Sequence, residues 1–363
     1  MATDRRSHRT AASDRLLDRT PGLSARARRW TLAGLIAAFV VVAVSLVVSS
    51  TPWPSALAIR AVFERGAADT VAEMEPFVPE TGVDARLDVA TDAAGDPGGA
   101  DTRLDVFTPA DDPGPHPTVV WVHGGAWISG AKENVDPYLR ILASHGYTTI
   151  GLDYTIAPEA TYPTALQELN ESLAYVVEHA DELGVDPDQI VLAGDSAGAQ
   201  LASQLAVLTT NQKYAHLLGL DPALDREQLV GAILDCGVYD LRAMAELNGL
   251  GQWGFKVALW AYTGTKDWSS SYAGTTMSTI EFVTEDFPPT FISGGNGDAL
   301  TWIQSVPMSD ALADAGVDTT ELFWAADHEP ALPHEYQFHL DFEEAHVALD
   351  ETLAFLAEHT AQQ

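Results

Sequence analysis

The sequence predicts an α/β protein in which a mostly parallel sheet carries helices on both faces. Short apolar runs typical of buried strands alternate with longer segments that have apolar residues at helical spacing, which is typical of a parallel sheet. Residues 118–123 (TVVWVH) form a nearly continuous apolar run, as in a strand buried on both faces. Residues 189–208 are predicted to form a strand, a sharp turn and a helix in direct succession.

The N-terminal fifty residues differ from the rest of the chain. Residues 1–30 hold eight arginines and three aspartates, a net charge of +5, and are expected to form a disordered cytoplasmic tail. Residues 31–50 contain no charged side chain and are long enough to span a bilayer as a helix. We interpret this segment as an uncleaved transmembrane signal anchor that holds residues 51–363 outside the cytoplasmic membrane.

Two alternatives for the N-terminus are open. Residues 56–58 (Ala-Leu-Ala) would suit a cleavage site, and cleavage there would make the protein secreted. Arg28-Arg29, directly before the apolar run, would fit a twin-arginine signal.

The remainder of the chain is strongly acidic. Beyond residue 30 it has 49 acidic and 11 basic side chains, a net charge of −38. Such a body repels nucleic acid, so no nucleic-acid partner is expected. The charge is compatible with a neutral or cationic substrate, although an acidic solubility coat is the simpler interpretation. The single cysteine, Cys236, excludes an internal disulfide and is expected in the core.

The individual elements follow from periodicity and from breakers. Strands are expected at 85–90, 103–108, 118–123, 148–153, 189–193, 230–236, 289–293 and 319–324. Helices are expected at 56–74, 138–145, 165–183, 197–208 and 342–359. Residues 92–101, rich in Gly, Ala and Asp, are expected to form a turn. The helix at 56–74 is expected to pack near the mouth of the site.

The segment Gly194-Asp195-Ser196-Ala197-Gly198 has the pattern of a nucleophile elbow. A serine at the apex of a strand–turn–helix needs close backbone approach on both sides, which glycines two residues before and after it allow. We therefore predict Ser196 as a nucleophile. Backbone N–H groups of Gly124 and Gly125, after an early buried strand, and of Ala197 are the candidate oxyanion donors.

A serine nucleophile needs a base and an acid that orients the base. Asp298 lies in a Gly-rich loop after the second strand beyond the elbow and is the predicted acid, although it would also suit a helix N-cap. Asp310 is a lesser candidate. Three histidines follow the last strand, and we favour His334, between that strand and the final helix, over His328 and His339.

With these residues assembled, the chain resembles α/β-hydrolases of the hormone-sensitive-lipase-like esterase group and related carbohydrate- and feruloyl-esterase-like hydrolases. The matching segments are 123–127 (HGGAW), 153–159 (DYTIAPE), 194–198 (GDSAG), 297–300 (GDAL) and 334–338 (HEYQF). The resemblance implies an eight-stranded, mostly parallel sheet with a cap, and ester hydrolysis without a cofactor. It also implies Ser196, Asp298 and His334 as the triad.

The chain departs from the family pattern at two of these segments. The group usually has His-Gly-Phe at the base, where this chain has His334-Glu335-Tyr336, and Arg-Leu where this chain has Thr155-Ile156. We expect Asp153 and Glu159 to brace the fold by hydrogen bonds. Residues 237–286 are expected to form a cap-like insertion. The substrate contacts are assigned to Trp127, Asp195, Trp253 and Trp260.

These residues predict a serine esterase that cleaves short- or medium-chain carboxylic esters of small molecules through an acyl-enzyme. An amidase, formamidase or peptidase on the same fold is the first alternative, and a non-catalytic binding module is the second. A metal-dependent hydrolase is disfavoured because none of the eleven histidines forms a spacing such as H-E-x-x-H. No metal or cofactor is expected.

Overall fold

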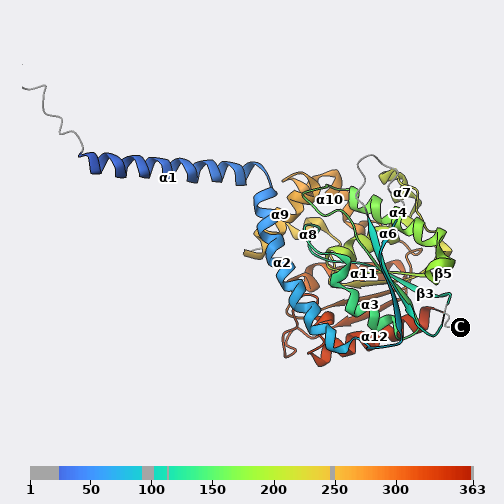
Figure 1. Cartoon of the computed structure of the whole chain (residues 1–363). Helices are drawn as coiled ribbons and strands as arrows, with labels where there is room; N and C mark the ends of the chain where they lie inside the picture. The colour runs from blue at the N-terminus through green and yellow to red at the C-terminus, as the bar shows by residue number, and fades with distance from the viewer. Residues whose placement is uncertain (1–23, 92–101, 113, 246–249, 361–363) are drawn as a thin grey trace, which may run out of the picture. The chain divides into compact units, whose positions relative to one another are not determined.

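A computed structural model describes residues 24–91, 102–112, 114–245 and 250–360, drawn in Figure 1. The chain divides into two units, residues 1–51 and 52–363. Most of the predicted tail and the predicted turn at 92–101 lie outside the described residues. In the first unit, helix α1 (Ala25–Ser50) is long and apolar enough to cross a membrane, a property that membrane anchors share with signal sequences.

The second unit is built on one eight-stranded sheet in the order β1-β2-β4-β3-β5-β6-β7-β8. Pairing is antiparallel between β1 and β2 and between β2 and β4, and parallel across the rest. The strands are β1 (Val83–Ala90), β2 (Arg103–Pro109), β3 (His116–Val122), β4 (Thr148–Leu152), β5 (Val185–Asp195), β6 (Leu229–Asp235), β7 (Thr290–Gly294) and β8 (Thr319–Phe323). The predicted eight-stranded, mostly parallel sheet is confirmed.

Helices cover both faces of the sheet (Figure 1). Those of the second unit are α2 (Trp53–Met74), α3 (Asp136–Ala143), α4 (Thr164–Glu178), α5 (Ala180–Leu183), α6 (Ala197–Thr210), α7 (Gln212–Leu218), α8 (Leu241–Met244), α9 (Leu250–Thr263), α10 (Tyr272–Met277), α11 (Val306–Ala315) and α12 (Glu343–His359). The segment predicted as a single helix at 165–183 is two helices, because the α4 geometry ends at His179.

Side-chain alternation along the strands explains the two layers. Val119 and Trp121 of β3 pack with α3 and α12, whereas Val120 and Val122 pack with α4 and α6 on the opposite face. Because both faces are covered, β3 is buried along its whole length, as its continuous apolar sequence predicted.

The central parallel strands end at one edge of the sheet, and this edge holds the candidate site. The polar residues that follow β3, β5 and β7 are therefore brought together there, as is usual in open α/β sheets. The predicted insertion between β6 and β7 contains α8, α9 and α10, and residues 246–249 within it lie outside the described part of the chain.

Candidate active site

The turn between β5 and α6 holds Ser196 in an unusual backbone conformation, with φ 52° and ψ −116°. A Cβ at Gly198 would lie 1.9 Å from the carbonyl oxygen of Val122, and one at Gly194 would lie 2.6 Å from the carbonyl carbon of Gly198. Both positions therefore require glycine, which is the close approach that the sequence pattern predicted. Strain of this kind is typical of functional positions.

Ser196, His334 and Asp298 form a continuous hydrogen-bonded chain. His334 Nε2 lies 2.8 Å from Ser196 Oγ, and His334 Nδ1 lies 2.6 Å from Asp298 Oδ2. The second oxygen of Asp298 accepts the N–H of Leu300 at 2.9 Å, so this carboxylate both orients the histidine and caps the next helical turn. The structure thus brings together the three residues that the sequence singled out.

Asn296 links the loop of the acid to the loop of the base, a role that the sequence did not reveal. Its side-chain oxygen accepts the N–H of Leu332 at 2.9 Å, and its side-chain nitrogen donates to the carbonyl oxygen of His328 at 2.8 Å. The N–H of Gly297 donates to the carbonyl oxygen of Leu332 as well. These bonds fix the spacing between Asp298 and His334.

The other candidate acid and bases have partners other than Ser196 or lie exposed, although His339 lines the same cavity. Nε2 of His328 pairs with Glu344 at 2.7 Å, and Nδ1 of His339 pairs with Glu73 at 2.5 Å. Asp310 lies exposed on α11. His334 is therefore the histidine of this loop that contacts the serine.

Gly124 and Gly125, the candidate oxyanion donors, lie just after the end of β3. Both line the same cavity as Ser196 and His334. The carbonyl of Gly125 is turned away into a tight turn, where it accepts the N–H groups of Ile128 and Ser129. Ala197 is the first residue of α6, and the first N–H groups of a helix have no acceptor within it.

The electrostatics around His334 favour its protonated form. Burial lowers the pKa of His334, but the Cys236 sulfur and the Asp298 carboxylate, both hydrogen-bonded to the ring, together raise it well above the usual value. Burial raises the pKa of the Cys236 thiol to about 12, so this thiol is neutral at neutral pH. The Asp298 carboxylate is therefore the charge that acts on the imidazole. Cys236 is a core residue, as predicted.

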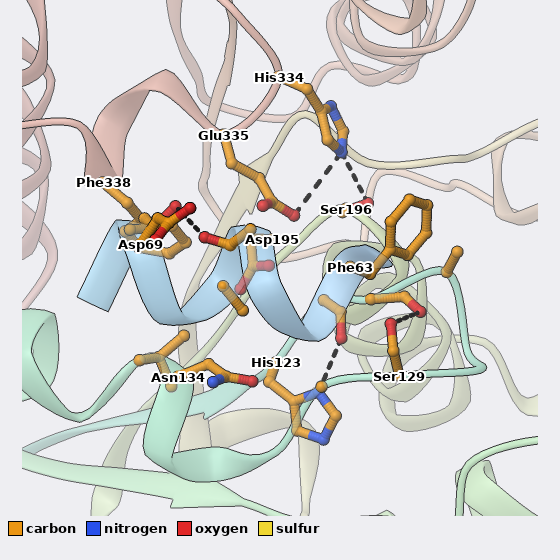
Figure 2. Close-up of a pocket in the computed structure, with 18 of the residues that line it drawn as sticks. Phe63, Asp69, His123, Ser129, Asn134, Asp195, Ser196, His334, Glu335 and Phe338 are labelled. Carbon is orange, nitrogen blue, oxygen red and sulfur yellow. Dashed lines mark hydrogen bonds and ion pairs between the residues drawn. The ribbon is translucent and has the colours of Figure 1, made fainter. Parts of the chain in front are cut away.

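A cavity of about 480 Å³ opens over Ser196 and His334 (Figure 2). Helix α2 lines one side of it, as expected for the helix predicted at the mouth of the site.

Bidentate pairing of Arg60 with Glu159, at 2.8 and 2.6 Å, ties α2 to the loop after β4. Asp153 accepts the backbone N–H of Lys132 at 2.9 Å. Asp153 and Glu159 therefore brace the fold, as predicted.

Of the four residues assigned to substrate contact, one lines the cavity. Asp195 lines the cavity, but Trp127, Trp253 and Trp260 are not among its lining residues. Trp127 is fully buried and donates to Gln200, Trp253 is exposed to solvent, and Trp260 packs under the ammonium group of Lys266. Phe255 of α9 lines the cavity instead. Trp253 and Trp260 lie on other sides of the same helix.

Fold and site together define an α/β-hydrolase. Residues 104–312, more than half of the chain, match the protein-family model described as BD-FAE, and the chain belongs to this family. This agrees with the esterase group that the sequence motifs indicated.

Solved structures of esterases share the fold. An inhibited form of esterase B from Lactobacillus rhamnosis superposes with a TM-score of 0.71 at 25% identity, covering 84% of this chain and 96% of that one. A hyperthermophilic esterase from the archaeon Pyrobaculum calidifontis has a TM-score of 0.66 at 23% identity, covering 86% and 95%. The carboxylesterase EstE1 from a metagenomic library has a TM-score of 0.65 at 21% identity, covering 86% and 99%.

Proposed function

We propose that the protein hydrolyses carboxylic esters of small molecules with a short or medium acyl chain, through an acyl-enzyme on Ser196. Its class, a carboxylic ester hydrolase, is that of its family and of its structural relatives. The observation that carries the mechanism is the chain of hydrogen bonds from Ser196 through His334 to Asp298, at 2.8 and 2.6 Å, beneath an open cavity.

In the acylation step, Ser196 Oγ attacks the ester carbonyl while His334 Nε2 takes its proton. Asp298 holds the imidazole in the required orientation and stabilises its charged form. The N–H groups of Gly124, Gly125 and Ala197 stabilise the negative oxygen of the tetrahedral intermediate. His334 then gives its proton to the leaving alcohol, and the acyl group stays on Ser196.

In the deacylation step, His334 removes a proton from a water molecule that attacks the acyl-enzyme. The tetrahedral intermediate again places its charge on the oxyanion donors. The proton returns from His334 to Ser196 Oγ as the acid leaves, which restores the starting enzyme.

The volume and the lining of the cavity support a short or medium acyl chain. Its volume, about 480 Å³, is modest for a ligand site, and Val62, Phe63, Phe255 and Phe338 supply an apolar lining. The test is turnover of p-nitrophenyl esters of graded acyl length by the full chain in detergent, with matched anilides. We expect the highest kcat/KM from about four to eight carbons and little cleavage of anilides. No turnover of any ester would refute the esterase function, and equal anilide cleavage would favour an amidase.

The pH profile provides a prediction about Asp298. Only neutral His334 can take the serine proton, so kcat/KM rises with pH through the pKa of His334, which lies above 6.5. Asp298→Asn removes a charge that raises this pKa, so the midpoint is expected to move to lower pH while the plateau falls by roughly 10⁴. Stopped assays between pH 5 and 9 measure both. A midpoint that stays in place in Asp298→Asn would contradict the assigned role.

For the N-terminus we propose that residues 31–50 form a signal anchor, with the Arg-rich residues 1–30 in the cytoplasm and residues 51–363 outside the membrane. The apolar length of α1 and its arginine-rich flank support this topology. Alkaline extraction of membranes tests the anchor, because a cleaved signal would leave the protein in the soluble fraction.

Residues 237–286 are proposed to act as the cap over the site.

A further inference from the structure

Carboxyl groups dominate the charge of the cavity over Ser196. Asp69 and Glu73 from α2 line it together with Asp195 and Glu335. None of the described residues that line it is a lysine or an arginine. Two histidines of the lining face carboxyl groups: His339 Nδ1 lies 2.5 Å from Glu73, and His334 Nε2 lies 3.7 Å from Glu335.

Glu335 lies close to the reacting atoms. It follows His334 directly, and its Oε1 lies 3.7 Å from His334 Nε2, the atom that also contacts Ser196 (Figure 2). A Cβ placed on Gly124 would lie 2.8 Å from the same Oε1, so the carboxylate lies over Gly124. The side chain is half-buried and turned into the cavity.

Asp195 lies next to Glu335 and is the more deeply buried carboxyl group of the two. One oxygen of Asp195 accepts the indole N–H of Trp121 at 2.8 Å. Burial raises the pKa of Asp195 well above its usual value, and the neighbouring Glu335 carboxylate raises it further. Asp195 is buried, whereas the Glu335 side chain is 30% exposed, so Glu335 is the member of the pair that solvent reaches.

Three aromatic rings, those of Phe63, Phe255 and Phe338, line the same cavity as Glu335. Ammonium groups are attracted to aromatic faces as well as to carboxylates. The net charge of −38 beyond residue 30 would also draw cations toward the body.

We propose that Glu335 determines specificity by binding an ammonium group on the alcohol part of the ester, so that the preferred substrates are esters of amino alcohols. This inference rests on the proposed function. His334 Nε2 gives its proton to the leaving oxygen, and Glu335 Oε1 lies 3.7 Å from that nitrogen. An ammonium group two or three bonds from the leaving oxygen is thus within reach of the carboxylate.

The same geometry implies a cost for neutral esters. A carboxylate over Gly124 repels the negative oxygen that forms in the tetrahedral intermediate, because both charges lie in a partly water-excluded site. A substrate ammonium group neutralises the carboxylate, whereas a neutral substrate leaves the repulsion in place. Removing the charge of Glu335 should therefore lower kcat/KM for cationic esters and raise or maintain it for neutral esters.

The experiment compares two thioesters that differ only in charge: butyrylthiocholine and 3,3-dimethylbutyl thiobutyrate, in which carbon replaces the ammonium nitrogen. The full chain in detergent is assayed for thiol release at low ionic strength. We expect the wild type to prefer the cationic thioester by at least about tenfold in kcat/KM. Glu335→Gln should lower kcat/KM for the cationic thioester and maintain or raise it for the neutral one.

Glu329→Gln is the matched control, because it removes the same charge from an exposed position of the same loop. It should leave the preference unchanged. Equal turnover of both thioesters by an active wild type would overturn the inference while the esterase function stands. A cationic preference that survives in Glu335→Gln would also overturn it. No turnover of either thioester, with no labelling of Ser196 by a fluorophosphonate, would refute the proposed function and the inference with it.

Discussion

Ser196→Ala is expected to lower kcat for a p-nitrophenyl ester by roughly 10⁶, the scale of nucleophile removal in a serine hydrolase. The substitution deletes one oxygen atom from a nearly buried side chain. No covalent intermediate can then form at this position. The residual rate would come from the oxyanion donors and from substrate binding, which the substitution leaves in place. Steady-state kinetics and thermal unfolding of the full chain measure activity and folding side by side.

Ser203→Ala is the matched control for this experiment. Ser203 lies on the same helix, α6, is fully buried, and its hydroxyl donates to the carbonyl oxygen of Gln200 at 2.7 Å. The same hydroxyl lies 2.9 Å from Thr279 Oγ1, and losing the two bonds costs about 1 kcal/mol of stability each. The residue does not line the cavity, so activity should persist. Ser196→Ala activity within tenfold of the wild type would show that another group is the nucleophile.

His334→Gln is expected to lower kcat by roughly 10⁵ to 10⁶, because the serine then has no group to take its proton. Glutamine keeps hydrogen-bonding capacity near Ser196 and Asp298 but is not a base at neutral pH. His328→Gln should retain nearly full activity, since His328 pairs with Glu344 away from the cavity. A loss of activity in His328→Gln that matched the loss in His334→Gln would contradict the assignment of the base.

Local sequence signals are enough to predict the turn at Ser196 and the two residues that the structure joins to it by hydrogen bonds, His334 and Asp298. Gly194 and Gly198 lie so close to neighbouring backbone atoms that a Cβ at either position would overlap them. Asp298 and His334 were found because each lies in a loop at the carboxyl end of a strand, and parallel strands bring such loops to one edge. The geometry of these residues depends mainly on the topology of the sheet.

The lining of the cavity could not be predicted in the same way. Trp253 and Trp260 were chosen for their aromatic rings, yet Phe255 is the residue of α9 that lines the cavity. Side-chain direction depends on how the helix is rotated against its neighbours, and a short, largely apolar helix does not specify that rotation. Asn296 was missed because its partners, Leu332 and His328, are more than thirty residues away.

Glu335 shows how a departure from a family pattern becomes informative once its surroundings are known. In the sequence it was a mismatch at the position after the predicted base. In the structure its carboxylate lies beside His334 and over Gly124, next to the buried Asp195. Because its Oε1 lies 3.7 Å from His334 Nε2, Glu335 is a candidate for selecting the substrate.

Labelling of the full chain with a fluorophosphonate probe, followed by mass spectrometry, identifies the activated nucleophile. We expect one labelled residue, Ser196, in the wild type and no labelling in Ser196→Ala or His334→Ala. Labelling that persists in His334→Ala would show that a group other than His334 activates the serine. A folded wild type that takes up no probe would contradict the assignment of Ser196 as an activated nucleophile and would favour a non-catalytic binding module.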